Sequence, residues 1–154
     1  MIKDFELSLE RIQCVTNPHV KKICSRLKCF ERRYLIKGDQ YRITQVVSNL
    51  IYNAINSILG KEGLIVVSVE KKVEDDTNFV ITHIKDNGDG IHSEIISRLF
   101  TKFATKSFYG TGLGLYVCKE IMEMHRGMIW GKNNEHDKGA TFSFKLPVID
   151  QISY

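Results

Sequence analysis

The sequence predicts an α+β fold, a two-layer α/β sandwich whose mostly antiparallel sheet is covered by helices on one face. A long amphipathic helix precedes two β-rich runs, and a later helix precedes two more β-rich runs. This order does not match the regular alternation of strand and helix that is typical of a doubly wound parallel sheet. With 154 residues, 43% of them hydrophobic, the chain is long enough for one domain with its own core.

The N-terminal part is expected to be a leading, mainly helical segment over residues about 5–30. Asn17 could cap a helix that starts at Pro18, because proline suits the first helical position. A short strand is expected at 34–36. We therefore divide the chain into a leading segment 1–34, a core 35–148 and a tail 149–154.

The strongest element in the sequence is a helix predicted over residues 40–59, which Gly60 is placed to end. Its apolar residues recur at helical spacing; they are Ile43, Val47, Leu50, Ile51, Ala54 and Ile58. Asn49, Asn53 and Asn56 follow one another at intervals of four and three, so they share a face away from this stripe. Such a face is either a solvated surface or a ligand face, because amides offer oxygen to Mg²⁺ and N–H donors to phosphate.

The middle of the chain is predicted to form strands at 64–70 and 79–84, then a short helix that Ser93 caps. This helix would carry four apolar residues, Ile95, Ile96, Leu99 and Phe100. Residues 86–90, Asp-Asn-Gly-Asp-Gly, lie between the second strand and this helix. Residues 101–110 show no periodicity and are expected to form a loop.

The cluster at 86–90 allows three interpretations. Asn-Gly is common in hairpin turns, and a calcium loop is disfavoured because Gly88 stands where an oxygen ligand is required. In the third interpretation Asp86 accepts a hydrogen bond from an exocyclic amine such as that of adenine. Gly88 and Gly90 would then let the backbone lie against the base.

The last third is predicted to be a helix ending near Gly127, followed by strands at 128–130 and 141–146. Alternating glycines at 110–115 precede this helix, and glycines before a helix N-terminus can hold phosphate. The spacing fits neither a Walker A loop nor a dinucleotide fingerprint. Thr105, Lys106 and Lys102 lie just upstream and suit phosphate oxygens, although lysines in a loop are usually solvated.

Composition narrows the class of protein. The net charge of +4 is mild and does not indicate nucleic acid binding. No apolar run approaches a membrane span, and the N-terminus is too charged for a secretory signal. The cysteines are Cys14, Cys24, Cys29 and Cys118, and none of them forms a Cys-x-x-Cys pair. We therefore expect reduced thiols and a cytoplasmic location. A membrane anchor elsewhere in a parent protein is left open.

Five segments, in order, resemble the sequence boxes of sensor histidine kinases. Residues 49–54 resemble the N box, 86–91 the G1 box, 99–103 the F box, 110–115 the G2 box and 139–142 the final glycine–threonine element. The match covers about residues 35–147. The resemblance implies a Bergerat-type ATP-binding fold, which gyrase, the heat-shock 90 chaperones and MutL share.

The resemblance also implies roles for single residues. Asn53 would be the Mg²⁺ ligand and Asn49 a phosphate-side contact, while Asp86 would recognise the adenine amine with support from Thr141. Residues about 101–111 would form a short ATP lid. The remaining contacts would line the base pocket, the lid and the phosphate turn; they are Asn56, Gly88, Gly90, Ile91, Thr105, Lys106, Gly110, Thr111, Gly112, Leu113, Gly114 and Leu115. Many family members carry a phosphate-binding lysine where this chain has Asn56, so Lys106 or Lys102 is the candidate replacement.

The sequence favours a kinase over an ATPase. Related ATPases carry a glutamate base four residues before the Mg²⁺ asparagine, and Asn49 cannot take a proton from water. Phosphoryl transfer needs mainly positioning and charge neutralisation. None of the five histidines has the sequence context of a phosphoacceptor; they are His19, His83, His92, His125 and His136.

We therefore expect a catalytic domain that binds Mg–ATP and phosphorylates a histidine on a dimerisation domain outside this chain, with a response regulator downstream. No catalytic residue is assigned within the chain. The alternatives are a non-catalytic nucleotide-binding switch module and an anti-sigma-type serine kinase. A gyrase-like ATPase fits least.

Overall fold

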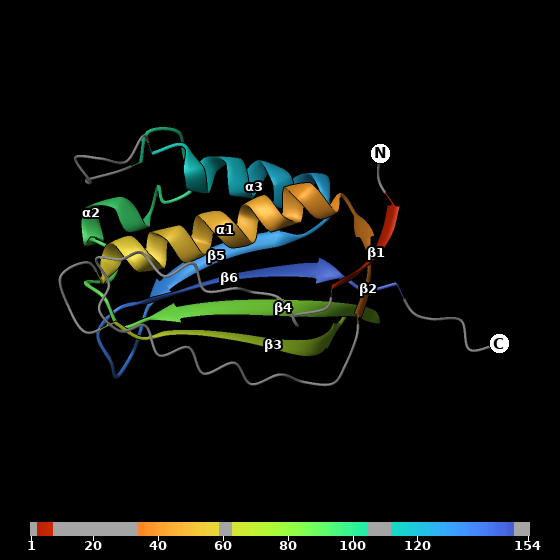
Figure 1. The fold of residues 1–154 in the computed structure, drawn as a ribbon, viewed down its shortest axis with the longest axis horizontal. Helices are drawn as coiled ribbons and strands as arrows, with labels where there is room; N and C mark the ends of the chain where they lie inside the picture. Colours follow the sequence, from red (N-terminus) through yellow and green to blue (C-terminus); the bar gives the residue numbers. More distant parts are fainter. Residues whose placement is uncertain (1–2, 8–33, 59–62, 105–111, 150–154) are drawn as a thin grey trace.

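The computed structural model describes residues 3–7, 34–58, 63–104 and 112–149, and its main body has two layers (Figure 1). One layer is a four-stranded sheet in the order β3-β4-β6-β5, with all neighbours antiparallel. The strands are β3 (Ile65–Glu74), β4 (Thr77–Asp86), β5 (Met128–Asn133) and β6 (Ala140–Pro147). Helices α1 (Gln40–Ser57) and α3 (Gly114–Met124) lie side by side over one face. The predicted fold class is confirmed.

The beginning of the chain differs from the prediction. Lys3–Leu7 is a strand, β1, which pairs antiparallel with β2 (Tyr34–Gly38), so the helix expected from about residue 5 is wrong there. Charged and apolar residues alternate from Asp4 to Leu7, which is the period of a strand. Residues 8–33 of the predicted leading helix, and Gly60, lie outside the described residues.

Helix α1 begins at the Asp39 cap, whose side chain accepts from the backbone N–H groups of Tyr41 and Arg42. Its buried stripe is rotated slightly from the predicted one, because the helix packs on α3 as well as on β4. The buried positions include Val46 and Ile55, whereas Val47 and Ile51 are only half-buried.

All four sheet strands are longer than predicted. The β3–β4 hairpin turns at Asp75 and Asp76, which have positive φ values of 46° and 60°. Two consecutive positive φ values are typical of the type I′ turn, whose twist matches that of paired strands. The polar ends of both strands therefore pair up to this turn, with Glu74 opposite Thr77.

The short helix α2 (Ser93–Ile96) is not capped by Ser93. Its N-cap is His92, whose Nδ1 accepts from the Glu94 N–H at 3.4 Å, and Ser93 is the first helical residue. The helix ends at Ile96, so Leu99 and Phe100 reach the core from the turns that follow it.

His125 has a structural role at the end of α3. Its Nδ1 donates to the Ile121 carbonyl at 2.7 Å, and its Nε2 accepts from the Asp39 N–H at 2.9 Å. The ring is buried and fills the space beside Gly38, where an added Cβ would lie 2.7 Å from its Cδ2. This histidine therefore joins the end of α3 to the beginning of α1.

A charged cluster closes the turn end of the sheet, on the face opposite the helices. The Lys145 ammonium pairs with the Glu74 carboxylate and lies 4.6 Å from the Phe79 ring centroid, and Lys72 lies 3.0 Å from Glu74. Hydrogen bonds from Lys145 and then Lys72 lower the pKa of Glu74. A lowered carboxyl pKa adds stability above the pKa of the unfolded chain, and this stability is lost as pH falls.

Replacing Lys145 with methionine is expected to raise the pKa of Glu74 toward its ordinary value of 4.5. The free energy of unfolding should then fall less steeply with pH below that value, because less ion pairing is lost on protonation. NMR titration of the Glu74 carboxyl and urea denaturation at several pH values measure both effects. Lys71→Met, at an exposed lysine, is the control; an unchanged pKa in Lys145→Met would contradict the assignment.

Candidate functional site

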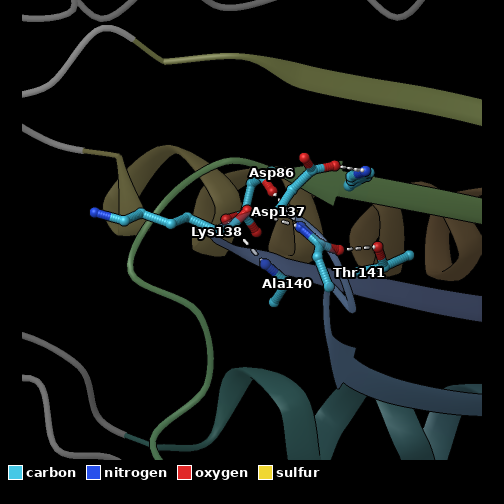
Figure 2. A network of polar contacts seen from close by, with 7 residues as sticks. Asp86, Asp137, Lys138, Ala140 and Thr141 are labelled. Carbon is cyan, nitrogen blue, oxygen red and sulfur yellow. Dashed lines mark hydrogen bonds and ion pairs between the residues drawn. The ribbon is translucent and has the colours of Figure 1, made fainter.

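The carboxylate of Asp86 lies at the C-terminal end of β4 and is 2% exposed. Its Oδ1 accepts from Ser57 Oγ at 2.9 Å, from the Gly88 N–H at 2.8 Å and from the Ala140 N–H at 3.4 Å. Figure 2 shows Ala140 beside Asp86, with its backbone N–H directed at the carboxylate. Among the described residues, every hydrogen bond to this side chain ends on Oδ1, so Oδ2 is the oxygen left for a ligand.

The glycines of the 86–90 segment make room for the protein itself. A Cβ on Gly88 would lie 2.2 Å from Ser57 Oγ, and Gly90 has φ +79° with Asn133 Oδ1 only 2.8 Å from its missing Cβ. The segment leads from β4 to α2 and is not the turn of a hairpin. Both glycines let the loop fold closely onto its neighbours.

Two consecutive asparagines at the end of β5 hold this loop at both ends. Asn133 accepts from the Ile91 N–H at 2.6 Å and donates to the Ile91 carbonyl at 2.9 Å. Asn134 donates to the Asp86 carbonyl at 2.9 Å. Sequence reasoning missed both residues, because they belong to a stretch that looked like a polar connecting loop.

Thr141 is connected to Asp86 only through another side chain. Its hydroxyl donates to Asn134 Oδ1 at 2.7 Å, and Asn134 in turn contacts the Asp86 main chain (Figure 2). Thr141 pairs with Lys85 across the strands, so its side chain lies on the sheet face opposite that of Asp86. The position next to the carboxylate is occupied by Ala140, through its backbone N–H.

A hollow of about 250 Å³ lies on this opposite face, and its lining mixes basic, acidic and neutral polar residues, Lys85, Lys132, Asn134, Glu135, His136, Asp137 and Thr141. Lys85 and Asp137 form an ion pair of 2.8 Å, and this hydrogen bond lowers the pKa of Asp137. Because the hollow and the Asp86 carboxylate lie on opposite faces of the sheet, Asp86 Oδ2 belongs to a different site.

The three asparagines of α1 have different environments. Asn49 is half-buried, and its Nδ2 lies 3.5 Å from both the Gly114 carbonyl and Cys118 Sγ at the start of α3. Asn53 is half-buried and makes no hydrogen bond within the described residues, while Asn56 is exposed. Burial raises the pKa of the Cys118 thiol, which keeps that side chain neutral.

The start of α3 forms a tight turn against the 99–104 segment. Gly112 has φ +67°, and its carbonyl accepts from the Phe103 N–H at 3.1 Å. Leu113 is the N-cap and Gly114 the first helical residue, while Leu115 packs on the core. Lys102 lies 5.0 Å from the ring centroid of Tyr116, in the first turn of the helix.

Four of the predicted contact residues lie outside the described residues; they are Thr105, Lys106, Gly110 and Thr111. The elements that carry the other predicted contact residues nevertheless come together in space. The C-terminal end of α1, the C-terminal end of β4 and the N-terminus of α3 all lie at the same end of the molecule (Figure 1). A carboxylate oxygen, amide groups and a helix N-terminus are thus gathered at one end.

A family model described as "Histidine kinase-, DNA gyrase B-, and HSP90-like ATPase" matches residues 38–150. The chain belongs to this family. The sensor histidine kinase ZraS of Salmonella typhimurium is 43% identical over 129 residues, covering 84% of this chain and 27% of ZraS. The sensor histidine kinase WalK of Bacillus subtilis is 30% identical over 157 residues, covering 98% of this chain and 24% of WalK. The chain thus spans about a quarter of these histidine kinase relatives.

Solved histidine kinase structures share the fold. The catalytic domain of ThkA superposes with a TM-score of 0.63 at 30% identity, covering 81% of this chain and 76% of that one. ThkA in complex with the response regulator protein TrrA gives a TM-score of 0.60 at 29% identity, covering 85% of this chain and 35% of that one. The predicted resemblance to histidine kinases is therefore confirmed. In the part of the chain that the structure describes, every helix is too short or too polar to cross a membrane.

Proposed function

We propose that this domain binds Mg–ATP and transfers the γ-phosphate to a histidine on a separate helical dimerisation domain in the cytoplasm. The observation that carries the proposal is the buried Asp86 carboxylate, whose Oδ1 is held by three donors and whose Oδ2 is left over. An exocyclic amine is the kind of donor that an acceptor fixed in this way would select. The sensor kinase relatives ZraS and WalK support the same function.

The base would lie between Asp86 and the loop that follows it. Ile91 is 8% exposed and held by Asn133 on both of its backbone groups, so it would offer a fixed apolar wall to the base. Gly88 and Gly90 keep the loop backbone close to its neighbours. An apolar wall with one oriented acceptor is typical of a site for a flat heterocycle.

The phosphates would lie at the N-terminus of α3, where the first backbone N–H groups and the positive end of the dipole favour anions. Asn53 would hold Mg²⁺: its half-buried amide has no partner among the described residues and lies on the helix that packs against α3. Mg²⁺ accepts few protein oxygens, and when bound it would neutralise charge on the phosphates. The exposed Lys102, whose ammonium lies beside the first turn of α3, would supply a positive charge for the phosphates.

The chemistry we propose is transfer to histidine and not hydrolysis. The imidazole nitrogen of the acceptor would attack the γ-phosphorus, the bond to the β–γ bridging oxygen would break, and ADP would leave. Asn49, which lies against Gly114 and Cys118, has an amide and cannot activate water as a base. The ThkA complex with a response regulator supports a later transfer to such a protein.

Transfer can be measured with γ-labelled ATP, Mg²⁺, this chain and a separate helical dimerisation domain that carries the acceptor histidine. We expect acid-labile phosphate on that domain. Asn53→Ala should lower the Mg²⁺-dependent rate by about 100-fold or more, because metal neutralisation of phosphate charge is worth several kcal/mol. Gln45→Ala, which removes an exposed amide two turns earlier on the same helix, should leave the rate unchanged.

Other outcomes would contradict the proposal in distinct ways. Acid-stable phosphate on a protein partner would indicate a serine kinase of the anti-sigma type. Tight ATP binding without transfer would indicate a nucleotide-dependent switch module. A fully active Asn53→Ala variant would refute the proposed metal ligand.

A further inference from the structure

We propose that Ser57 is a positioning residue that aims the Asp86 carboxylate at the amine of the base, and so determines preference for 6-amino over 6-oxo purine nucleotides. This inference rests on the proposed function, because it concerns the base pocket of the same site. Ser57 is the last residue of α1, and the sequence boxes gave it no role.

The Ser57 hydroxyl has two acceptors within reach. Its Oγ lies 2.9 Å from Asp86 Oδ1 and 2.9 Å from the Ala54 carbonyl. A hydroxyl has one proton, so it donates fully to one of them at a time. The ionised carboxylate is the stronger acceptor, since charge-assisted hydrogen bonds are roughly twice as strong as neutral ones.

The backbone of Ser57 fixes the following loop as well. Its carbonyl accepts from the Asp89 N–H at 3.2 Å, and Gly88 packs so closely that an added Cβ would lie 2.5 Å from the Ser57 carbonyl oxygen. Ser57 therefore contacts the base-reading segment at three of its residues. The end of α1 and the loop therefore hold each other in place around the hydroxyl.

Loss of the Ser57 hydroxyl would leave the Asp86 carboxylate freer to rotate. The two short bonds to Oδ1 come from Ser57 at 2.9 Å and Gly88 at 2.8 Å, while the Ala140 N–H lies farther away at 3.4 Å. Ser57 approaches from a helix and Gly88 from the adjoining loop, so together they restrain rotation of the carboxylate plane. With Gly88 alone at short range, Oδ2 would point less steadily toward the ligand.

The experiment compares equilibrium binding of ATP and ITP, which carries a 6-oxo group, to the wild-type chain and to Ser57→Ala. Ser48→Ala, at an exposed serine on the same helix, is the matched control. We expect Ser57→Ala to weaken ATP binding about tenfold, near the lower end of the loss expected for one hydrogen bond to a charged group. ITP binding should be unchanged, so the preference for ATP falls by the same factor.

A merely structural role would give a different result. Equal weakening for both nucleotides would overturn the inference, because a disturbed fold does not distinguish the 6-position of the base. Unchanged ATP binding in Ser57→Ala would also overturn it while leaving the proposed function intact. A wild-type chain that binds neither nucleotide would refute the proposed function, and this inference with it.

Discussion

Replacement of Asp86 by asparagine is expected to weaken ATP binding by about 100-fold or more, since a polar group meeting the wrong partner in a buried site is strongly penalised. The donors from Ser57, Gly88 and Ala140 all end on Oδ1. They would hold the oxygen of the new amide in that position and turn its NH₂ group into the pocket. The adenine amine would then face a donor in place of an acceptor.

The same argument predicts a change of specificity. A 6-oxo purine presents an acceptor at that position, so ITP should bind Asp86→Asn better than ATP does. Calorimetric titration of both nucleotides into both proteins measures the reversal. Asp89→Asn makes the same substitution at an exposed carboxylate of this loop and should keep the wild-type order; ATP binding at wild-type strength by Asp86→Asn would refute the base assignment.

Replacement of Gly139 by alanine is expected to lower the free energy of unfolding by about 3 kcal/mol or more, from backbone strain together with overlap of buried atoms. Gly139 has φ +97°, and its added Cβ would lie 2.1 Å from the Asp86 carbonyl oxygen. That oxygen belongs to the backbone and already accepts a hydrogen bond from Asn134, so moving it aside would cost stability. Ala140, which donates to the carboxylate, is the next residue.

Urea denaturation of Gly139→Ala measures this loss. Gly114→Ala is the stability control, because its Cβ would meet nothing within 4 Å and alanine is the better helix former. A Gly139→Ala protein as stable as the wild type would show that the loop at Asp86 adjusts freely. ATP binding by the folded fraction should weaken too, since the overlap falls on the residue that carries the carboxylate.

Sequence reasoning succeeded where the signal was local. The helical period of α1 and the β-rich runs can each be read within one stretch of chain. They predicted the two layers and the position of Asp86 at the end of a strand. The prediction failed at the start of the chain because residues 5–7 were included in a helical region over about 5–30, although their own alternation suits a strand.

The supporting residues of the site could not be found in this way. Asn134 reaches Asp86 and Thr141 from a stretch that reads as a loop, and only the pairing of β4, β5 and β6 brings these segments together. That pairing also explains why Thr141 lies on the other face, because one position along a strand reverses the direction of a side chain. Ser57 was missed because its partner lies 29 residues away in the sequence.

The continuity of α1 has a consequence for the size of the ligand. Asn53 and Ser57 are one helical turn apart, so they are separated by a rise of about 6 Å along an unbroken backbone. Under the proposed function, Asn53 would contact the metal and Ser57 would orient the acceptor for the base, so α1 would set the distance between the two ends of the nucleotide. Nucleotides with a longer or shorter link between base and phosphates would satisfy one end at the expense of the other.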